Sequence, residues 1–333
     1  MELITKKVNQ RITNLCQELT LLFDQHGNQV IGEITMQNLL GGMRGLKTMV
    51  CNTSYVDPQE GLFISGLPVP KFEDKTPEEI FFLLTTGQFP NKEELAELRQ
   101  ELNKRSEIPG FIWDLFRSVP KDTHPMTLFS MGILAIEGQS EFKKQYAAGM
   151  PKSEFWKYSL EDSLNLIAKL PSLAAGVYQI LFMNGKIIPH DNDLDLAGNL
   201  SQMLDINHKD STFADLIRLY LVLHCDHEGG NVSAFTARVV NSALSNLFYA
   251  TSAGLNGLAG PLHGLANQTC LHFISDILNE YGNDPSREEV QKFVMQTLES
   301  GKVIPGYGHA VLRATDPRFT SFLKFGEQHC SES

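Results

Sequence analysis

The chain has 333 residues and 42% hydrophobic content, enough for one large domain or two unequal ones. Charged residues make up 20%, and no apolar run looks long enough to span a bilayer, so we expect a soluble globular protein with no membrane partner. The formal net charge of -11 argues against a general nucleic-acid binder. An acidic protein can still bind acidic substrates where its few cations converge.

Cysteine usage is sparse and predicts no disulfide framework. The five cysteines are scattered singly, with no CxxC pair: Cys16, Cys51, Cys225, Cys270 and Cys330. A reducing compartment is therefore favoured over a secreted one. The first residues show no signal-peptide core, and their acidic residues and few arginines make a poor organellar presequence. We expect either a protein that stays where it is made or a sequence that starts after a presequence.

Apolar spacing predicts a mostly α fold with minor β-structure near the N-terminus. Residues 3–22 have the period of an amphipathic helix, whereas glycines punctuate short β-branched pieces across 27–66 and indicate small strands and turns. Three capping-box patterns mark helix starts, at Thr76 with Glu79, Asn91 with Glu94 and Ser286 with Glu289.

Further helices are predicted between proline and glycine breaks. Their ranges are 125–137, 153–169, 172–184, 194–204, 212–224, 231–245, 247–258, 264–280, 287–300 and 316–328. Pro171 is expected to separate two of them. The second of these, 172–184, is apolar almost all round, which suits a buried central helix or a helix-to-helix dimer face.

The run from His224 to Gly230 contains two histidines three residues apart and two carboxylates. One interpretation is a metal site, although no HExxH or further Cys/His set accompanies it. A second is a polar helix end with histidines favoured by the helix dipole and a diglycine cap. A third is a substrate-facing histidine, His227, that hydrogen-bonds a carboxylate.

His263 follows a Gly-Pro break, and the next helix is expected to start within a residue or two of it. The positive end of a helix disfavours imidazolium, so a neutral imidazole is expected there. A neutral imidazole can donate an N–H to a carbonyl oxygen and stabilise a forming enol. The alternative is a histidine that only caps the helix.

A third cluster, from Lys302 to Arg318, combines glycines with a local excess of cations. The glycines on either side of Tyr307 let backbone amides approach a ligand, and arginine forks suit carboxylates and phosphates. The alternative is a glycine turn before a basic helix start, since the P-loop pattern is missing. Gly41-Gly42-Met43-Arg44-Gly45 offers one further arginine in flexible backbone.

Together these stretches resemble the citrate synthase family, of the type found in mitochondria and in some bacteria. The motifs that carry the resemblance occur in the family's order: GGMRG (41–45), HPM (124–126), IAKLPS (167–172), HCDHEGGNVSA (224–234), NGLAGPLHGLANQ (256–268) and PGYGHAVLRATDPR (305–318). The resemblance implies a large helical domain over 1–264, with the dimer contacts and the oxaloacetate side. It also implies a smaller CoA-side domain over 265–333, incomplete within this chain.

The resemblance also implies a reaction and roles for named residues. The reaction is condensation of acetyl-CoA with oxaloacetate, followed by thioester hydrolysis to citrate and CoA, the entry step of the tricarboxylic acid cycle. His263 would donate to the thioester carbonyl, and His309 to the oxaloacetate carbonyl under attack. His227 and Arg318 would hold oxaloacetate oxygens.

The same resemblance places CoA on a glycine-rich segment and on separate cations. These CoA-binding residues are Val303, Ile304, Pro305, Gly306, Tyr307, Gly308, Arg313, Arg44 and Lys152, with Arg44 reaching across a homodimer. No metal or other cofactor is implied, because acetyl-CoA is a substrate. The compartment implied is the mitochondrial matrix for a eukaryotic protein and the cytoplasm for a bacterial one.

Three departures from the family accompany the resemblance. The family continues past residue 333, and its catalytic aspartate and two further arginines match nothing in this chain. Lys152 stands where the family has a CoA-binding arginine, which keeps the charge but loses the bidentate fork. Phe235 stands where the family usually has a histidine.

A general base contributes on the order of a hundred-fold or more, so we expect this chain to bind oxaloacetate weakly and to condense little. Two other functions stay open. One is a 2-methylcitrate synthase that uses propionyl-CoA, and the other is a non-catalytic structural or assembly protein on the same fold.

Overall fold

The computed structural model describes residues 1–40, 49–206, 211–261, 263–308 and 311–329. Over these residues the fold is mostly helical, as expected, with one small antiparallel sheet of order β1-β2-β3. The helices of the body are α3 (Pro77–Thr86), α4 (Lys92–Arg105), α5 (Phe111–Ser118), α6 (Pro125–Ala135), α7 (Glu141–Ala147), α8 (Phe155–Phe182), α9 (Leu196–Leu204), α10 (Thr212–Leu223), α11 (Val232–Ser242) and α12 (Leu247–Leu258). The remaining elements are α1 (Glu2–His26), α2 (Met36–Leu40), β1 (Ser54–Asp57), β2 (Gly61–Ile64), β3 (Leu67–Pro68), α13 (Ala266–Tyr281), α14 (Arg287–Glu299) and α15 (Pro317–His329).

The three predicted capping boxes are all confirmed, at the starts of α3, α4 and α14. In each, the cap side chain accepts from the backbone N–H three residues on, and the glutamate there accepts from the cap's own N–H. A cap of this kind stabilises a helix by about 1 kcal/mol.

Helix α8 corrects the prediction of a break at Pro171, because it runs unbroken through that residue. An interior proline costs about 3 kcal/mol, but Pro171 is buried among helices that pack around α8 on several sides, namely α4, α6, α7 and α9. Packing therefore overrides the local rule.

The expectation about membrane-spanning runs is corrected as well. Among the described helices, the stretch Lys152–Phe182 is long and apolar enough to cross a membrane by length and composition alone. Of its most apolar window, 56% is buried inside the protein, as is typical of the core helix of a globular protein.

Of the β-structure expected across 27–66, the described residues form β1 and β2 at the end of that range, and β3 lies just beyond it. β1 pairs with β2 in antiparallel register, Ser54 opposite Ile64 and Asp57 opposite Gly61, and β3 follows. Earlier in the range, the described residues form the short helix α2 and no strand. The hairpin buries Val56, Leu62 and Ile64 against α10 and the turn Val69–Phe72.

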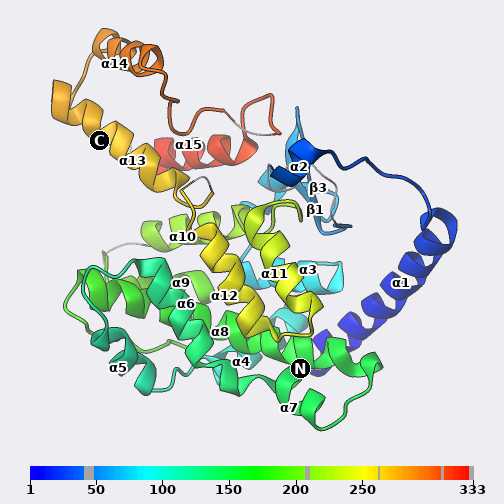
Figure 1. Ribbon diagram of the computed structural model, residues 1–333. Helices are drawn as coiled ribbons and strands as arrows, with labels where there is room; N and C mark the ends of the chain where they lie inside the picture. The colour runs from blue at the N-terminus through cyan, green and yellow to red at the C-terminus, as the bar shows by residue number, and fades with distance from the viewer. Residues whose placement is uncertain (41–48, 207–210, 262, 309–310, 330–333) are drawn as a thin grey trace.

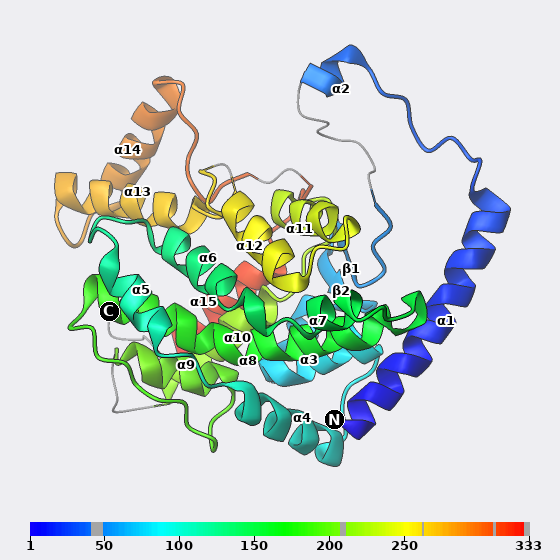
Figure 2. The same cartoon turned by 60° about the horizontal axis from the view of Figure 1, so that its bottom comes forward.

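The C-terminal elements are arranged in two ways relative to the body. Helices α13 and α14 contact each other and extend away from it, whereas α15 packs back against α10 and the turn Val69–Phe72 (Figures 1 and 2). At the other end of the chain, α1 anchors its first turns on the body through Ile4 and Val8, and its second half points away from the body.

Candidate active site

His263 lies in a tight turn between α12 and α13. Its N–H donates to the Gly260 carbonyl at 3.0 Å, and the N–H of Gly264 donates to the Leu258 carbonyl at 3.0 Å. A Cβ on Gly264 would lie 2.3 Å from that carbonyl oxygen, so the turn requires glycine there. Helix α13 begins only at Ala266, so His263 precedes the helix by one residue more than expected and does not cap it.

The imidazole of His263 is paired with a serine on a neighbouring helix. The Nε2 atom lies 2.8 Å from the hydroxyl oxygen of Ser233, which stands in the first turn of α11. The start of α11 is fixed by its cap, Asn231, whose side chain accepts from the N–H of Ala234.

Glycines on α12 allow α11 to come this close. A Cβ on Gly254 would lie 3.1 Å from the Ser233 carbonyl oxygen, and one on Gly257 would lie 3.0 Å from Val232 Cγ1. Larger side chains at these two positions would push the start of α11 away. The spacing of small residues on α12 therefore sets the position of Ser233 relative to His263.

The serine contact determines what the histidine can do. If the hydroxyl donates to Nε2, the imidazole is in the Nδ1–H tautomer and Nδ1 points its proton elsewhere. Both residues are half-buried, so the remaining N–H can meet a ligand that is partly screened from water. The pair can hold a neutral imidazole in one orientation as a donor to a carbonyl or oxyanion.

The loop between α10 and α11 carries His227, which is half-buried. The Asn231 side chain donates to the His227 carbonyl at 3.0 Å, and the backbone N–H of Glu228 donates to the Ser54 hydroxyl at 2.6 Å. These bonds tie the loop to the start of α11 and to the β1 strand. Among the described residues, no group of three or more His, Cys, Asp or Glu gathers as a metal site would require.

Cys225, in the same loop, is an unreactive thiol. Burial, with the Asp226 carboxylate nearby, raises the pKa of Cys225 to about 12. The group is therefore protonated at neutral pH and is a poor nucleophile.

His224 and Arg318 lie near each other where α15 packs on α10. The His224 ring stacks on Tyr220 at 4.5 Å between centroids and lies 5.8 Å from the Phe322 ring. Desolvation, with the Arg318 charge nearby, lowers the pKa of His224. Arg318 makes a fork to Asp316, with Nε to Oδ1 at 3.0 Å and Nη2 to Oδ2 at 2.6 Å.

The glycine-rich segment 303–308 approaches α13 at Cys270. Gly306 and Gly308 have φ of +83° and +89°, which favour glycine, and a Cβ on Gly306 would lie 3.3 Å from Cys270 Sγ. Val303 and Tyr307 are 80% and 83% exposed. The segment therefore lies beside the helix that His263 precedes, with side chains open to a ligand.

Of the other predicted site residues, the structure describes some and not others. The backbone N–H of Arg313 donates to the Pro58 carbonyl at 2.7 Å, which attaches this part of the chain to the β-hairpin. Lys152 is exposed in the turn before α8. His309 and Arg44 lie outside the described residues, so their positions in the site stay predictions.

Sequence reasoning missed Ser233 as a site residue. The signal was present, because Ser233 lies in the HCDHEGGNVSA run that carries the family resemblance. Its partner lies 30 residues further along the chain, so only the packing of α11 on α12 identifies the hydroxyl that faces the imidazole.

Comparison with known proteins gives a consistent family. The family model "Citrate synthase, C-terminal domain" matches residues 42–333. The mitochondrial citrate synthase of Saccharomyces cerevisiae is 45% identical, over 94% of this chain and 67% of its own length. Citrate synthase 4 of Arabidopsis thaliana, also mitochondrial, is 42% identical, over 98% of this chain and 70% of its own.

A relative with a different printed activity is also similar. The mitochondrial 2-methylcitrate synthase of Yarrowia lipolytica is 43% identical, over 94% of this chain and 70% of its own.

Solved structures share the fold. Citrate synthase from Pyrobaculum aerophilum matches with a TM-score of 0.79 at 25% identity, over 91% of this chain and 75% of that one. That from Thermoplasma acidophilum, solved as a ternary complex with carboxymethyl coenzyme A and oxaloacetate, matches with a TM-score of 0.74 at 22% identity, over 88% and 73%. The chain thus belongs to the citrate synthase family, a family of all-α transferases.

Proposed function

We propose that the protein condenses acetyl-CoA with oxaloacetate to give citrate and CoA. The observation that carries the proposal is the 2.8 Å contact between the Ser233 hydroxyl and His263 Nε2, which leaves Nδ1–H as a donor to a ligand when the hydroxyl donates to Nε2. The identity to citrate synthases over more than nine-tenths of the chain supports the assignment of the substrates.

In this mechanism His263 acts on the acetyl thioester. With the Ser233 hydroxyl donating to Nε2, the Nδ1–H of His263 donates to the thioester carbonyl oxygen. A base removes a proton from the methyl carbon, and charge develops on that oxygen as the enol forms, so the hydrogen bond strengthens along the reaction. The enol carbon then attacks the oxaloacetate ketone, whose oxygen takes a proton from His309, and water cleaves the thioester.

Oxaloacetate would be held by His227 and Arg318. The fork between Arg318 and Asp316 uses Nε and Nη2 and leaves the Nη1 donors outside it. A carboxylate can therefore bind Arg318 at Nη1 while Asp316 keeps the guanidinium oriented.

CoA would lie on the exposed face of 303–308, with Arg313, Lys152 and the partner's Arg44 meeting its phosphates. The exposed Val303 and Tyr307 side chains and the glycines beside them suit a ligand that approaches backbone. The division into a large domain, 1–264, and a smaller one, 265–333, belongs to this proposal. So does a reaction that runs without a metal.

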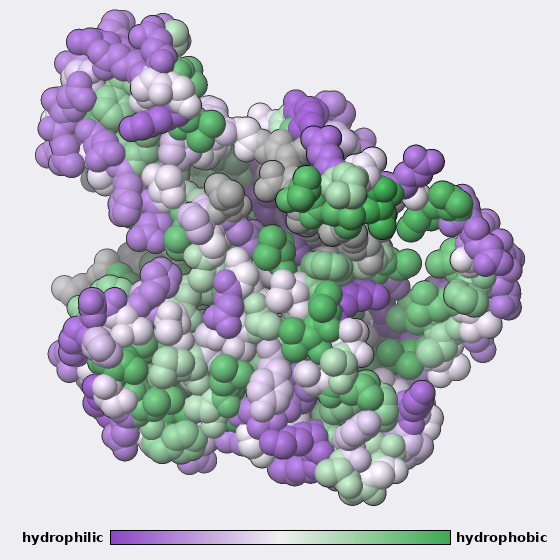
Figure 3. Space-filling model, in the orientation of Figure 1, coloured by the Kyte–Doolittle hydropathy of each residue, from purple (hydrophilic) through white to green (hydrophobic). Residues whose placement is uncertain are grey.

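We also propose a homodimer in the mitochondrial matrix, or in the cytoplasm if the source is bacterial. Large hydrophobic side chains are exposed on the outer half of α1 and on the segment after it, including Leu19, Leu22, Phe23, Val30 and Ile31. In Figure 3 hydrophobic residues show in this region, whereas the surface over α14 is mostly hydrophilic. Light scattering should give about twice 37.2 kDa, and a mass near 37.2 kDa would exclude the dimer.

A second candidate is 2-methylcitrate formation from propionyl-CoA, favoured by the 43% identity to the Yarrowia lipolytica enzyme. Thiol release from each acyl-CoA, measured with oxaloacetate, separates the two. We expect slow release that is at least ten-fold faster with acetyl-CoA and that is lost in His263→Ala. Faster release with propionyl-CoA would favour the second candidate, and release equal to that of His263→Ala would contradict both.

A further inference from the structure

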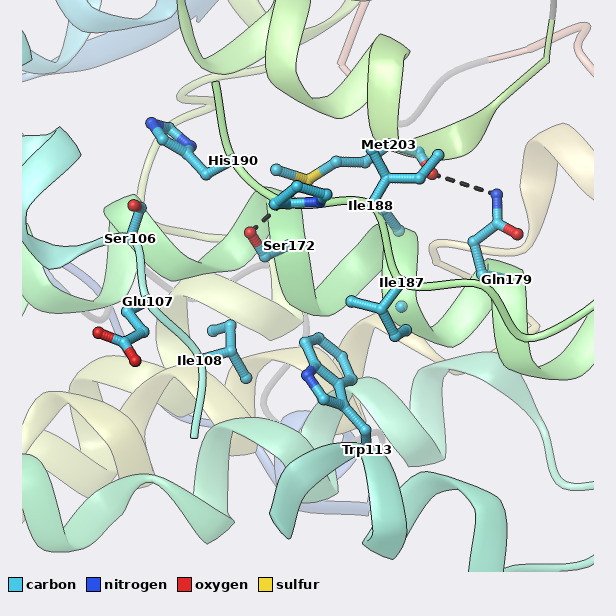
Figure 4. A pocket seen from close by; sticks show the side chains of 13 residues that line it. Ser106, Glu107, Ile108, Trp113, Ser172, Gln179, Ile187, Ile188, His190 and Met203 are labelled. Carbon is cyan, nitrogen blue, oxygen red and sulfur yellow. Dashed lines mark hydrogen bonds between the residues drawn. The ribbon is translucent and has the colours of Figure 1, made fainter. Parts of the chain in front are cut away.

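A cavity of about 280 Å³ lies away from the His263 turn, between α5, α8, α9 and the loop that joins α8 to α9 (Figure 4). Its walls are mainly apolar. The larger apolar side chains in them are Ile108, Trp113, Ile187, Ile188, Pro189 and Met203. None of the residues assigned above to the reaction lines it.

The cavity is preformed by specific packing. A Cβ on Gly176, inside α8, would lie 2.2 Å from Trp113 Cζ3, so the missing side chain is what lets the indole rest on the helix. Glycine in a helix interior costs about 1 kcal/mol relative to alanine, a cost that this contact explains. The loop wall is fixed by Asn103, whose Oδ1 lies 2.8 Å from His190 Nε2 and whose Nδ2 donates to the Asn192 carbonyl at 2.9 Å.

One polar group in the cavity wall, the Ser172 hydroxyl, has only a weak hydrogen-bond partner, whereas Gln179 and His190 are bonded to good acceptors or donors of the protein. The Ser172 hydroxyl donates to Met203 Sδ at 3.6 Å, and a thioether sulfur is a weak acceptor (Figure 4). A ligand with a better acceptor can therefore take over that O–H at little cost. Burial lowers the pKa of His190, so its imidazole is neutral at pH 7 and adds no positive charge to the cavity.

The charge and the volume of the cavity limit the kinds of ligand that it can bind. Of the described residues that line the cavity, Glu107 alone carries a full charge, and the whole chain has a net charge of -11. Anions are therefore disfavoured. A cavity of about 150 Å³ holds one benzene, so this larger one has room for two fused rings.

We propose that this cavity is a binding site for one planar bicyclic aromatic molecule that is uncharged or singly positive, with its ring against Trp113. CoA and oxaloacetate, the ligands of the proposed reaction, are both anionic, so this ligand belongs to a different chemical class. The proposal stands on the cavity alone and does not depend on the proposed function.

Fluorine NMR on the full chain labelled with 5-fluorotryptophan provides a site-specific test. The chain has two tryptophans, and Trp156→Phe assigns the Trp113 signal. The probes are 2-naphthamidine, 2-naphthamide and 2-naphthoate, which share one shape and carry charges of +1, 0 and -1. We expect the first two to shift the Trp113 signal saturably, and 2-naphthoate to bind at least ten-fold more weakly.

Substitutions inside and outside the cavity test whether the probes bind there. Ser172→Leu should weaken 2-naphthamide at least ten-fold, whereas Ser163→Leu, on the same helix but outside the cavity, should not change it. Glu107→Gln, at an exposed position, should remove the preference for 2-naphthamidine over 2-naphthamide. The proposal is overturned by a Trp113 signal that stays still up to the solubility limit, by equal shifts of Trp156, or by 2-naphthoate binding as tightly as 2-naphthamidine.

Discussion

At the scale of single residues, the candidate site contains residues that the sequence predicted and one, Ser233, that it did not predict. His263 and the 303–308 segment stood out through glycines and prolines that break helices, and the family motifs gave them roles. Ser233 was not predicted, because helical periodicity does not say which hydroxyl meets an imidazole on another helix. Two glycines on α12 decide that contact, and their effect depends on tertiary packing.

In the proposed mechanism Ser233 is a positioning residue that holds the His263 tautomer. Ser233→Ala should lower the kcat of thiol release on the order of ten-fold, or about 1.4 kcal/mol in activation free energy, because the imidazole loses its orientation. The KM for oxaloacetate should stay within two-fold. Ser233→Thr, which keeps the hydroxyl, should restore most of the rate, and equal rates for all three proteins would show that the contact has no catalytic role.

At the scale of elements, sequence patterns predicted helix starts correctly where only neighbouring residues are involved. They failed where packing in the core decides the structure. The three capping boxes formed as predicted, since each needs only residues three apart. Pro171 did not break α8, because buried contacts on several sides outweigh one missing hydrogen bond. The strands were placed too broadly, since glycine punctuation across 27–66 does not show which pieces pair.

The turn between α12 and α13 depends on glycine at position 264. In Gly264→Ala the added methyl group would meet the Leu258 carbonyl oxygen, so the turn must shift and carry His263 with it. We expect thiol release to fall at least ten-fold while the Tm changes by only a few degrees, since the turn lies at the edge of the body. Gly138→Ala is the control, because a Cβ there meets nothing within 4 Å. If both variants keep the native rate, the turn does not set the position of His263.

At the scale of the whole molecule, the family and the all-α fold were predictable from motif order and helical periodicity. The apolar pattern of 172–184 also predicted a buried central helix or a dimer face, and most of this stretch forms the buried second half of α8, but the burial of a charged side chain earlier in that helix was not predicted. This charged side chain is Lys169 in α8, which is 5% exposed. Its ammonium group donates a hydrogen bond to the Arg105 carbonyl. Desolvation by burial, with the Arg105 charge nearby, lowers the pKa of Lys169 to about 8.

This lowered pKa predicts a pH dependence of global stability. Between pH 8 and the ordinary value of 10.5, the unfolded chain holds a proton on Lys169 that the folded chain has lost, so stability rises with pH. Relative to Lys169→Met, the native protein should gain up to about 1.4 kcal/mol per pH unit in this window. Urea unfolding at pH 7.5, 8.5 and 9.5 measures the difference. The exposed Lys157→Met serves as the control, and parallel curves for native protein and Lys169→Met would refute the prediction.

The central claim is that His263, oriented by Ser233, donates a hydrogen bond to the acyl oxygen of a CoA thioester. Calorimetric titration with carboxymethyl-CoA, whose carboxylate stands in for the enol oxygen, tests it most directly when CoA itself is the reference ligand and oxaloacetate is present. We predict that His263→Ala weakens carboxymethyl-CoA at least ten-fold and leaves the affinity for CoA within two-fold. Equal losses for both ligands, or no loss for carboxymethyl-CoA, would contradict the claim.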